Sequence, residues 1–322
     1  MSKGSIQSRA HTIQVRQLAS FVAVADSGSM RLAARQLGLT QPALTKSLKE
    51  LEAVTGVVLL ERTARGSVPT KAGTVFLARA RSIVEELRRA HEEMRSLAGV
   101  QEGSVTVGLS AGAALLAGSA IEQFIRSQPH LRVRVVAGLF DQLVTGVRQG
   151  RLDFAVGGFM AGESDDRLKF SKLFDYRIVP AVRHRHPLAN ATSLEDLVDC
   201  EWALTTDDPA YIASFTKHFV RLGLKVPQVR LHSESLLAIV ETVSCSDLVV
   251  AVPETFLLHP IPATYLTPVP VTDPCPKAQF ALVRKREVQL TDHANRLARL
   301  IAKSATSRRS DPRSGSPGRR NG

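Results

Sequence analysis

The chain has 322 residues, of which 44% are hydrophobic and 22% are charged. That length exceeds one ordinary domain and predicts two or three compact units with buried cores. No run of eighteen apolar residues occurs, and the first eleven residues lack the apolar centre of a signal peptide. The composition therefore argues against a membrane-spanning helix, and we expect a globular protein of the cytoplasm.

The formal net charge of +12 favours a polyanionic partner, but the distribution of the charge matters more. Residues 304–322 carry five arginines and one aspartate among Ser, Pro and Gly. Because such a segment cannot bury apolar surface, we expect it, like residues 1–12, to be disordered. Extra non-specific affinity for DNA is the alternative role for this basic tail. Residues 13–75 are also basic, with eight Lys and Arg against four Asp and Glu.

The three cysteines, Cys200, Cys245 and Cys275, are widely spaced. Since there is no CxxC motif and no cluster with metal-ligand spacing, the sequence predicts reduced thiols, no metal site and no resident cofactor. A redox-switch pair is the alternative for the thiols.

Residues 13–70 are predicted to form three helices and a hairpin. Apolar residues recur at helical spacing from Val15 to Ala25. A second helix is expected over 30–37, because Ser29 before it is a good N-cap.

The third predicted helix covers residues 40–53. Thr40 is its N-cap, and Pro42 lies in its first turn, where the missing N–H costs little. Two short helices joined by a glycine turn are typical of a helix-turn-helix, whose second helix reads DNA. Strand-like residues on both sides of 63–66 then predict a hairpin with basic residues near its tip, which is a wing.

A long helix is predicted over 71–99, with Thr70 as its cap. Its apolar residues alternate at spacings of four and three: Phe76, Ala80, Ile83, Leu87, Ala90, Met94 and Leu97. Packing on its own domain is one role for this stripe. So narrow a seam on so charged a helix favours the other role, pairing with a second copy, and we expect a dimer.

From residue 103 onward, short strands alternate with helices, which predicts a mostly parallel α/β sheet over 103–303. Two lobes are expected, lobe I over about 103–178 and 280–303 and lobe II over about 179–279. Strands are expected at 105–109, 131–136, 153–157, 168–173, 177–182, 202–204, 229–232, 248–253 and 280–283. Ligands of such sheets bind where strand C-termini and helix N-termini meet.

Six segments between residues 13 and 75 resemble the signature of LysR-type transcriptional regulators: 33–37, 40–48 (TQPALTKSL), 51–52, 59–62, 65–66 and 70–73. The rest of the chain resembles that family in layout. It departs from the family's pattern at 244–248, where glycines are usual.

The resemblance implies a winged helix-turn-helix, a dimerising linker helix and a periplasmic-binding-protein-like domain for a small-molecule effector. It also implies dimers that pair into tetramers and contact double-stranded promoter DNA at two places. RNA polymerase is a further candidate partner.

Several side chains of the 40–53 helix suit DNA. Gln41 can bond an adenine edge in two places, Lys46 can donate to guanine O6 and N7, and Pro42 can contact a thymine methyl. Phosphate contacts are predicted for Thr40, Thr45, Lys49 and Arg62, and a minor-groove contact for Arg65. A solvated helix face is the alternative for each.

The candidate effector site is assembled from strand ends. Ser110 opens a helix directly after the first strand of lobe I, so its hydroxyl and nearby N–H groups could hold an anion. The other candidates end strands at the same crevice: Gly157, Phe159, Thr205, Thr206, His232 and Ser233. We expect a small organic acid, although helix capping is the alternative role for Ser110 and Thr205.

No catalytic constellation is found, since there is no nucleophile elbow and no glycine-rich phosphate loop with a lysine. The sequence therefore predicts a protein that is not an enzyme. An architectural DNA-binding protein without an effector is the alternative function. A solute-binding protein is a more remote alternative, because it leaves residues 1–75 without a role.

Overall fold

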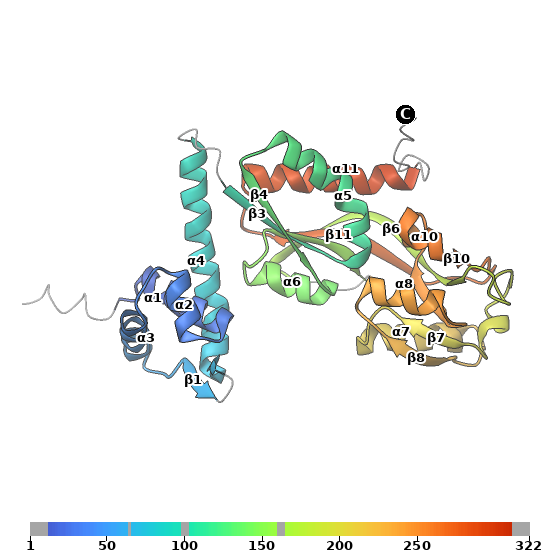
Figure 1. The fold of residues 1–322 in the computed structure, drawn as a ribbon, viewed down its shortest axis with the longest axis horizontal. Coiled ribbons are helices and arrows are strands. Elements are labelled where there is room, and N and C mark those ends of the chain that lie inside the picture. Colours follow the sequence, from blue (N-terminus) through green and yellow to red (C-terminus); the bar gives the residue numbers. More distant parts are fainter. Residues whose placement is uncertain (1–11, 64–65, 98–102, 160–164, 311–322) are drawn as a thin grey trace, which may run out of the picture. The chain divides into compact units, whose positions relative to one another are not determined.

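The computed structural model describes residues 12–63, 66–97, 103–159 and 165–310. They form two compact units, the first before Gly103 and the second built from Gly103–Arg148 and the chain from Leu152 onward. Figure 1 shows the first unit as helices with a small hairpin and the second as a sheet with helices on its faces. The predicted disordered segment 1–12 lies outside the described residues except for Thr12.

The first unit begins with α1 (Val15–Ser27), α2 (Met30–Gln36) and α3 (Gln41–Thr55). The N-caps are those that the sequence predicts, since Ser29 accepts from Leu32 and Thr40 accepts from Ala43. The three helices bury one apolar cluster that includes Phe21, Leu44 and Leu51. Burial of those side chains holds α3 in place and leaves its other face to solvent.

The predicted wing is the antiparallel hairpin of β1 (Leu60–Thr63) and β2 (Gly66–Pro69). A carboxylate ties it to α3, because Glu52 Oε1 accepts from the backbone N–H groups of Leu59 and Leu60 at 2.8 and 3.2 Å. Hydrogen bonds to a charged group are among the stronger ones, so they fix where the hairpin leaves the helix.

The predicted apolar seam lies on the long helix α4 (Lys71–Leu97), and its two parts differ in burial. Phe76 contacts the ring of Phe21, with 5.7 Å between the centroids, and Ala80 is fully buried in the core of the first unit. The prediction that the whole seam faces a second copy is therefore wrong for Phe76 and Ala80, because α1 already covers them. Further along, apolar side chains are half exposed or more: Ile83 at 50%, Leu87 at 52% and Met94 at 60%.

The second unit is built on one sheet with the strand order β4-β3-β5-β11-β6-β9-β7-β8, and β10 pairs with β6. Its strands are β3 (Gly103–Leu109), β4 (Leu131–Ala137), β5 (Phe154–Phe159), β6 (Leu168–Arg183), β7 (Glu201–Leu204), β8 (Gln228–His232), β9 (Val249–Pro253), β10 (Leu266–Pro268) and β11 (Lys277–Lys285). The expectation of a mostly parallel sheet holds for β3, β4 and β5 in lobe I and for β7, β8 and β9 in lobe II. It is wrong where these two groups meet, because β11 and β6 run antiparallel to their neighbours. These are the strands that carry the chain between the lobes.

β6 also corrects a second expectation. The sequence predicts two strands at 168–173 and 177–182, whereas one strand of 16 residues runs through both. Its first part pairs with β11 in lobe I, and its last part pairs with β9 and β10 in lobe II. The α/β two-lobed architecture itself is confirmed.

Helices cover the sheet in both lobes. Lobe I carries α5 (Ala111–Ser127), α6 (Phe140–Arg148) and α11 (Asp292–Ser310), and lobe II carries α7 (Pro209–Arg221), α8 (Leu236–Ser244), α9 (Glu254–Leu257) and α10 (Pro260–Tyr265). Phe124, Phe154 and Phe280 are central to the core of lobe I. In lobe II, Trp202 lies edge-on to Phe215 and Phe219.

The chain beyond residue 303 is not disordered from 304 as expected, because α11 continues to Ser310. Ala305 is 2% exposed, and the Ser304 hydroxyl donates to the carbonyl oxygen of Leu116 at 2.8 Å. Burial on α5 and this hydrogen bond stabilise the extra helical turn, whereas residues 311–322 lie outside the described chain.

α8 ends at the glycine-free segment 244–248 with Cys245 as its C-cap, and an ion pair of Asp247 follows. Asp247 Oδ1 accepts from Nη2 of Arg183 at 2.7 Å and from its Nε at 3.0 Å. Arg183 also donates to the backbone carbonyl oxygen of Arg185 at 2.9 Å, so the end of β6 is tied to this segment.

Candidate nucleic-acid interface and ligand-binding lobes

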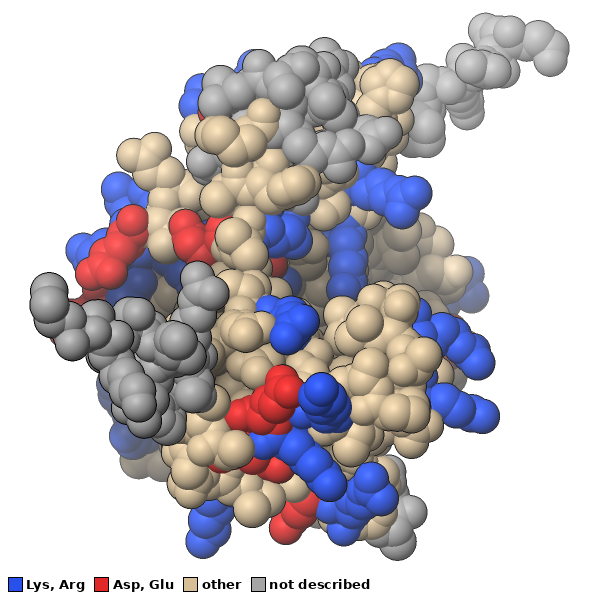
Figure 2. Space-filling model, turned by 90° about the vertical axis from the view of Figure 1, so that its left-hand side faces the viewer, with Lys and Arg blue, Asp and Glu red and all other residues tan. Residues whose placement is uncertain are grey.

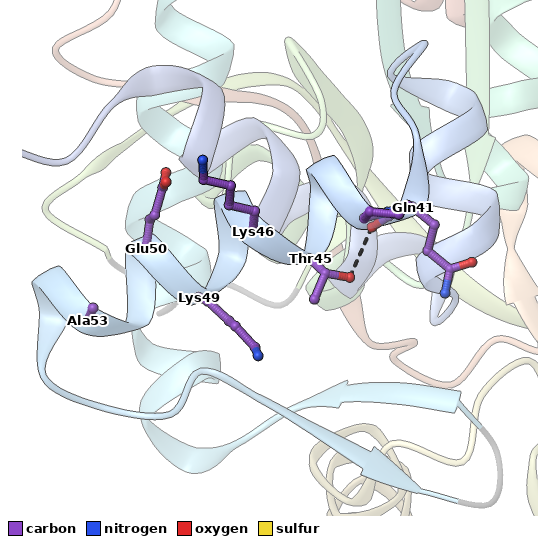
Figure 3. A pocket seen from close by; sticks show the side chains of 7 residues that line it. Gln41, Thr45, Lys46, Lys49, Glu50 and Ala53 are labelled. Carbon is purple, nitrogen blue, oxygen red and sulfur yellow. Dashed lines mark hydrogen bonds between the residues drawn. The ribbon is translucent and has the colours of Figure 1, made fainter.

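The outer face of α3 is an open hollow of about 730 Å³. It is lined by Gln41, Pro42, Thr45, Lys46, Lys49, Glu50 and Ala53. Figure 3 shows these side chains along one helix, with Lys46 and Glu50 on one side and Lys49 on the other. The amides, hydroxyls and ammonium groups here are those that donate to base edges and phosphates.

Local hydrogen bonds arrange the start of this face. Thr40 Oγ1 accepts from the N–H of Ala43, which leaves its own hydroxyl proton free for an acceptor on a partner. The Thr45 hydroxyl donates to the carbonyl oxygen of Gln41 at 2.9 Å, so it offers a partner only its acceptor oxygen. The predicted phosphate contact of Thr45 would require this bond to break, because a phosphate accepts hydrogen bonds and does not donate them. Gln41, Lys46 and Lys49 are exposed.

The hairpin contributes Arg62, which is exposed on β1. Arg65 lies outside the described residues, so its predicted minor-groove contact stays a prediction. Figure 2 shows lysine and arginine side chains spread more widely than carboxylates over the visible face. That distribution favours a polyanion on this face.

In lobe I, the candidate ligand residues meet at one edge of the sheet. β3 and β5 are parallel neighbours, and the Ser110 N–H after β3 donates to the carbonyl oxygen of Val156 on β5 at 3.0 Å. Gly157 lies beside Ser110, because a Cβ added at Gly157 would be 3.1 Å from the Ser110 Cβ. Ser110 also caps α5 through Ala113, which is the alternative role that the sequence allows.

The ring of Phe159 is occupied by packing. Its centroid lies 5.7 Å from that of Phe140 and 5.6 Å from that of Phe170. A stacking contact between this ring and a ligand stays a prediction.

In lobe II, β7 and β8 end side by side, with Leu204 opposite His232. The Ser233 N–H donates to the carbonyl oxygen of Leu204 at 3.1 Å, and the His232 ring Nδ1 lies 3.1 Å from the carbonyl oxygen of Thr206. Thr206 is 8% exposed and accepts from the N–H of Asp208, so its hydroxyl helps to start α7.

Two tyrosines lie near these candidates, although no pattern in the sequence indicates them. The Tyr176 hydroxyl lies against Gly158, where an added Cβ would be 2.2 Å from it. Burial and then the nearby Tyr211 raise the pKa of Tyr176. Burial likewise raises the pKa of Tyr211 to about 12, while a hydrogen bond with Thr205 lowers it. Both phenols are therefore neutral near pH 7.

Within the described ranges, no helix is long and apolar enough to cross a membrane. The same part of the chain contains no group of three or more His, Cys, Asp or Glu side chains that could hold a metal ion.

A winged helix-turn-helix with a polar, basic recognition helix, followed by a two-lobed α/β domain, defines a class of DNA-binding regulators. Two family models match the chain: "Bacterial regulatory helix-turn-helix protein, lysR family" over residues 15–74 and "LysR substrate binding domain" over residues 98–306. The chain belongs to the LysR family of transcriptional regulators, and it is not an enzyme.

Curated relatives align over most of the chain. The regulator TdcA of Escherichia coli K12 is 27% identical over 289 residues, which cover 89% of this chain and 92% of the relative. The regulator GalR of Pseudomonas putida is 29% identical over 277 residues, which cover 85% of this chain and 70% of the relative.

Solved structures share the fold. CbnR, a LysR family regulator, has a TM-score of 0.63 at 23% identity and covers 91% of this chain and 99% of its own. Full-length OxyR C199D from Pseudomonas aeruginosa has a TM-score of 0.67 at 20% identity, with coverages of 92% and 95%.

Proposed function

We propose that this protein binds a specific promoter sequence through α3 and the wing, and that a small organic acid bound between its lobes controls that activity. One observation carries the DNA-binding part: Gln41, Thr45, Lys46 and Lys49 line one continuous open face of α3. The solved complex of CbnR with its target DNA supports this reading. A location in the cytoplasm, where promoter DNA lies, belongs to the proposal.

The assembly that binds is a dimer formed along α4, and two dimers pair into a tetramer that contacts the promoter at two places. The exposed Ile83, Leu87 and Met94 support the dimer, because half-exposed apolar side chains in a row are typical of a covered surface. RNA polymerase is a further proposed partner, because a regulator bound at a promoter lies beside the polymerase that transcribes from it.

Lys46 tests the DNA-binding part. Lys46→Ala removes a donor to guanine, so we expect the affinity for the preferred duplex to fall by about 1–3 kcal/mol. The duplex is first selected from a random library with the wild-type protein, and gel-shift titrations at one fixed salt concentration measure the affinity. Lys303→Ala is the matched control, because it removes an exposed charge from α11 instead. Equal affinities for wild type and Lys46→Ala contradict the role of Lys46.

Ser110 tests the effector part. The N-cap hydroxyl and the first N–H groups of α5 are suited to a carboxylate. A thermal-shift screen of small organic acids on the wild-type protein identifies a ligand, and we expect Ser110→Ala to lose most of the shift. An undiminished shift in Ser110→Ala removes this residue from the site.

Occupancy is proposed to close the lobes and to bias an existing equilibrium between tetramer shapes, which alters the spacing of the two DNA contacts. Footprints with and without the acid found in the screen check this. Identical footprints and unchanged transcription favour the alternative, an architectural protein without an effector.

A further inference from the structure

One acidic side chain, Glu50, stands on the basic outer face of α3. It lines the same hollow as Lys46 and Lys49 and is half-buried. Among the described residues no lysine or arginine forms an ion pair with it, although Lys46 stands on the same side of α3 (Figure 3). A carboxylate on a phosphate-binding face opposes binding unless it meets a donor.

The carboxylate is held in place by Gln17 of α1, a side chain only 4% exposed. The Nε2 of Gln17 donates to Oε2 of Glu50 at 3.3 Å, while its Oε1 accepts from the backbone N–H of Gln14 at 2.9 Å. Because the acceptor end of this amide is used by Gln14, its donor end must face Glu50. The reversed amide would place two acceptors against each other.

The hydrogen bond from Gln17 affects how Glu50 meets DNA. A free glutamate would rotate away from an approaching phosphate, whereas Glu50 is fixed to the core of the first unit. Its repulsion acts on any duplex, since the phosphate charges do not depend on sequence. In the major groove, only exocyclic amino groups, N4 of cytosine and N6 of adenine, can donate to it.

We propose that Glu50, fixed by Gln17, is a specificity-determining residue that weakens binding to every duplex except those whose sequence places an exocyclic base amine within hydrogen-bond reach of its carboxylate. This inference rests on the proposed DNA-binding function and goes beyond it. It assigns the discrimination between DNA sequences to a residue that is negatively charged, as DNA is.

The test compares two duplexes of equal length and composition at one salt concentration: the sequence selected by the full-length wild-type protein, and a scrambled version. Glu50→Gln removes the charge but can still accept from Gln17, so the fold is retained. We expect Glu50→Gln to bind the scrambled duplex roughly 3- to 10-fold more tightly, from the loss of one like-charge repulsion at close range. For Glu50→Gln, the affinity for the selected duplex divided by the affinity for the scrambled duplex should therefore fall by at least about 3-fold relative to wild type.

Two further variants separate the explanations. Glu122→Gln removes one exposed carboxylate from α5, so it makes the same change in net charge away from α3, and we expect both affinities to stay at wild-type values. Gln17→Met keeps the Glu50 charge but releases it, and we expect an intermediate ratio. Denaturation curves of each variant confirm folding.

The outcomes are distinct. A Glu50→Gln ratio equal to that of the wild type, or an equal change with Glu122→Gln, overturns the inference. If the wild-type protein selects no common sequence from the library, the proposed function itself fails.

Discussion

The backbone N–H of Ser67 in the wing donates to the carbonyl oxygen of Gly28, 2.9 Å away, in the turn between α1 and α2. The neighbouring Gly66 has a φ of +124°, and a Cβ added there would lie 2.2 Å from that same oxygen. Only glycine combines this backbone conformation with so close an approach. The wing is thereby fastened to the body of the first unit as well as to α3.

Gly66→Ala is expected to destabilise the first unit by about 2 kcal/mol or more, from the strained backbone and the contact with Gly28. Urea denaturation followed by far-UV circular dichroism measures it. Gly118→Ala is the opposite control, because that helical glycine has open space around it, and alanine there should stabilise by about 0.5–1 kcal/mol. Shifts of the same sign in both variants contradict the role given to Gly66.

The exposed part of α4 predicts a change in assembly. Ile83→Glu combined with Leu87→Glu places two charges on the surface that the proposed dimer covers, so we expect the particle mass to fall to at most half that of the wild-type assembly, whose single chain has a mass of 34.9 kDa. Light scattering after size exclusion measures it. Val220→Glu alters a side chain that is 62% exposed on α7 and should leave the mass unchanged. A double variant that keeps the wild-type mass argues against dimerisation through α4.

Gly158 and Tyr176 form a pair that a double-mutant cycle can test. Gly158→Ala should destabilise the second unit, because the new methyl group meets the tyrosine hydroxyl on β6. Tyr176→Phe removes that hydroxyl, so the double variant should recover about 1–2 kcal/mol of the loss. Urea denaturation of the four proteins gives the coupling. Strictly additive effects would mean that the two groups do not meet.

His218 predicts a dependence of stability on pH. This α7 side chain is 7% exposed, its Nε2 has no hydrogen-bond partner among the described residues, and burial, followed by Arg221, lowers its pKa while Asp273 raises it. Since an unfolded histidine takes up its proton at about pH 6.5, the unfolded chain binds more protons just below that pH. Stability is therefore lost as the pH falls from about 6.5 towards the lower pKa of the folded state, and it is unaffected by this group above that range.

The fluorescence of Trp202 follows this loss, because it is the single tryptophan of the chain and its ring centroid lies 5.5 Å from that of Phe219, which in turn contacts His218. His218→Leu should flatten the decline below about pH 6.5. His130→Gln, an exposed control, should keep the wild-type decline. Parallel declines in wild type and His218→Leu would assign the acid sensitivity elsewhere.

Local signals account for what the sequence predicts well. Ser29 and Thr40 are N-caps whose hydrogen bonds reach only three residues along the chain, to Leu32 and Ala43. Such local contacts are visible in the sequence, and the start of the recognition helix can be predicted from them. The DNA-facing residues Gln41 and Lys46 follow from the same local pattern.

Contacts between distant segments account for what the sequence does not predict. Glu50 looks like one more solvated glutamate until Gln17, 33 residues earlier, is seen to bond it. Likewise, nothing near Ser304 indicates that its hydroxyl will bond the backbone of Leu116, 188 residues away, and extend α11. A periodic pattern also does not show which surface covers it, so the spacing alone predicts a second copy against Phe76, whereas Phe21 of the same chain lies there.

The strand pairing of β6 with β11 places Arg177 directly opposite Lys277. The chain leaves lobe I at the first residue and re-enters it at the second, so the whole of lobe II is an insertion between two adjacent backbone positions. A short turn joining Arg177 to Lys277 would close lobe I without removing any of its own strands. A different lobe II could therefore be exchanged between these two positions, while lobe I and the DNA-binding end of the chain keep their own strands and helices.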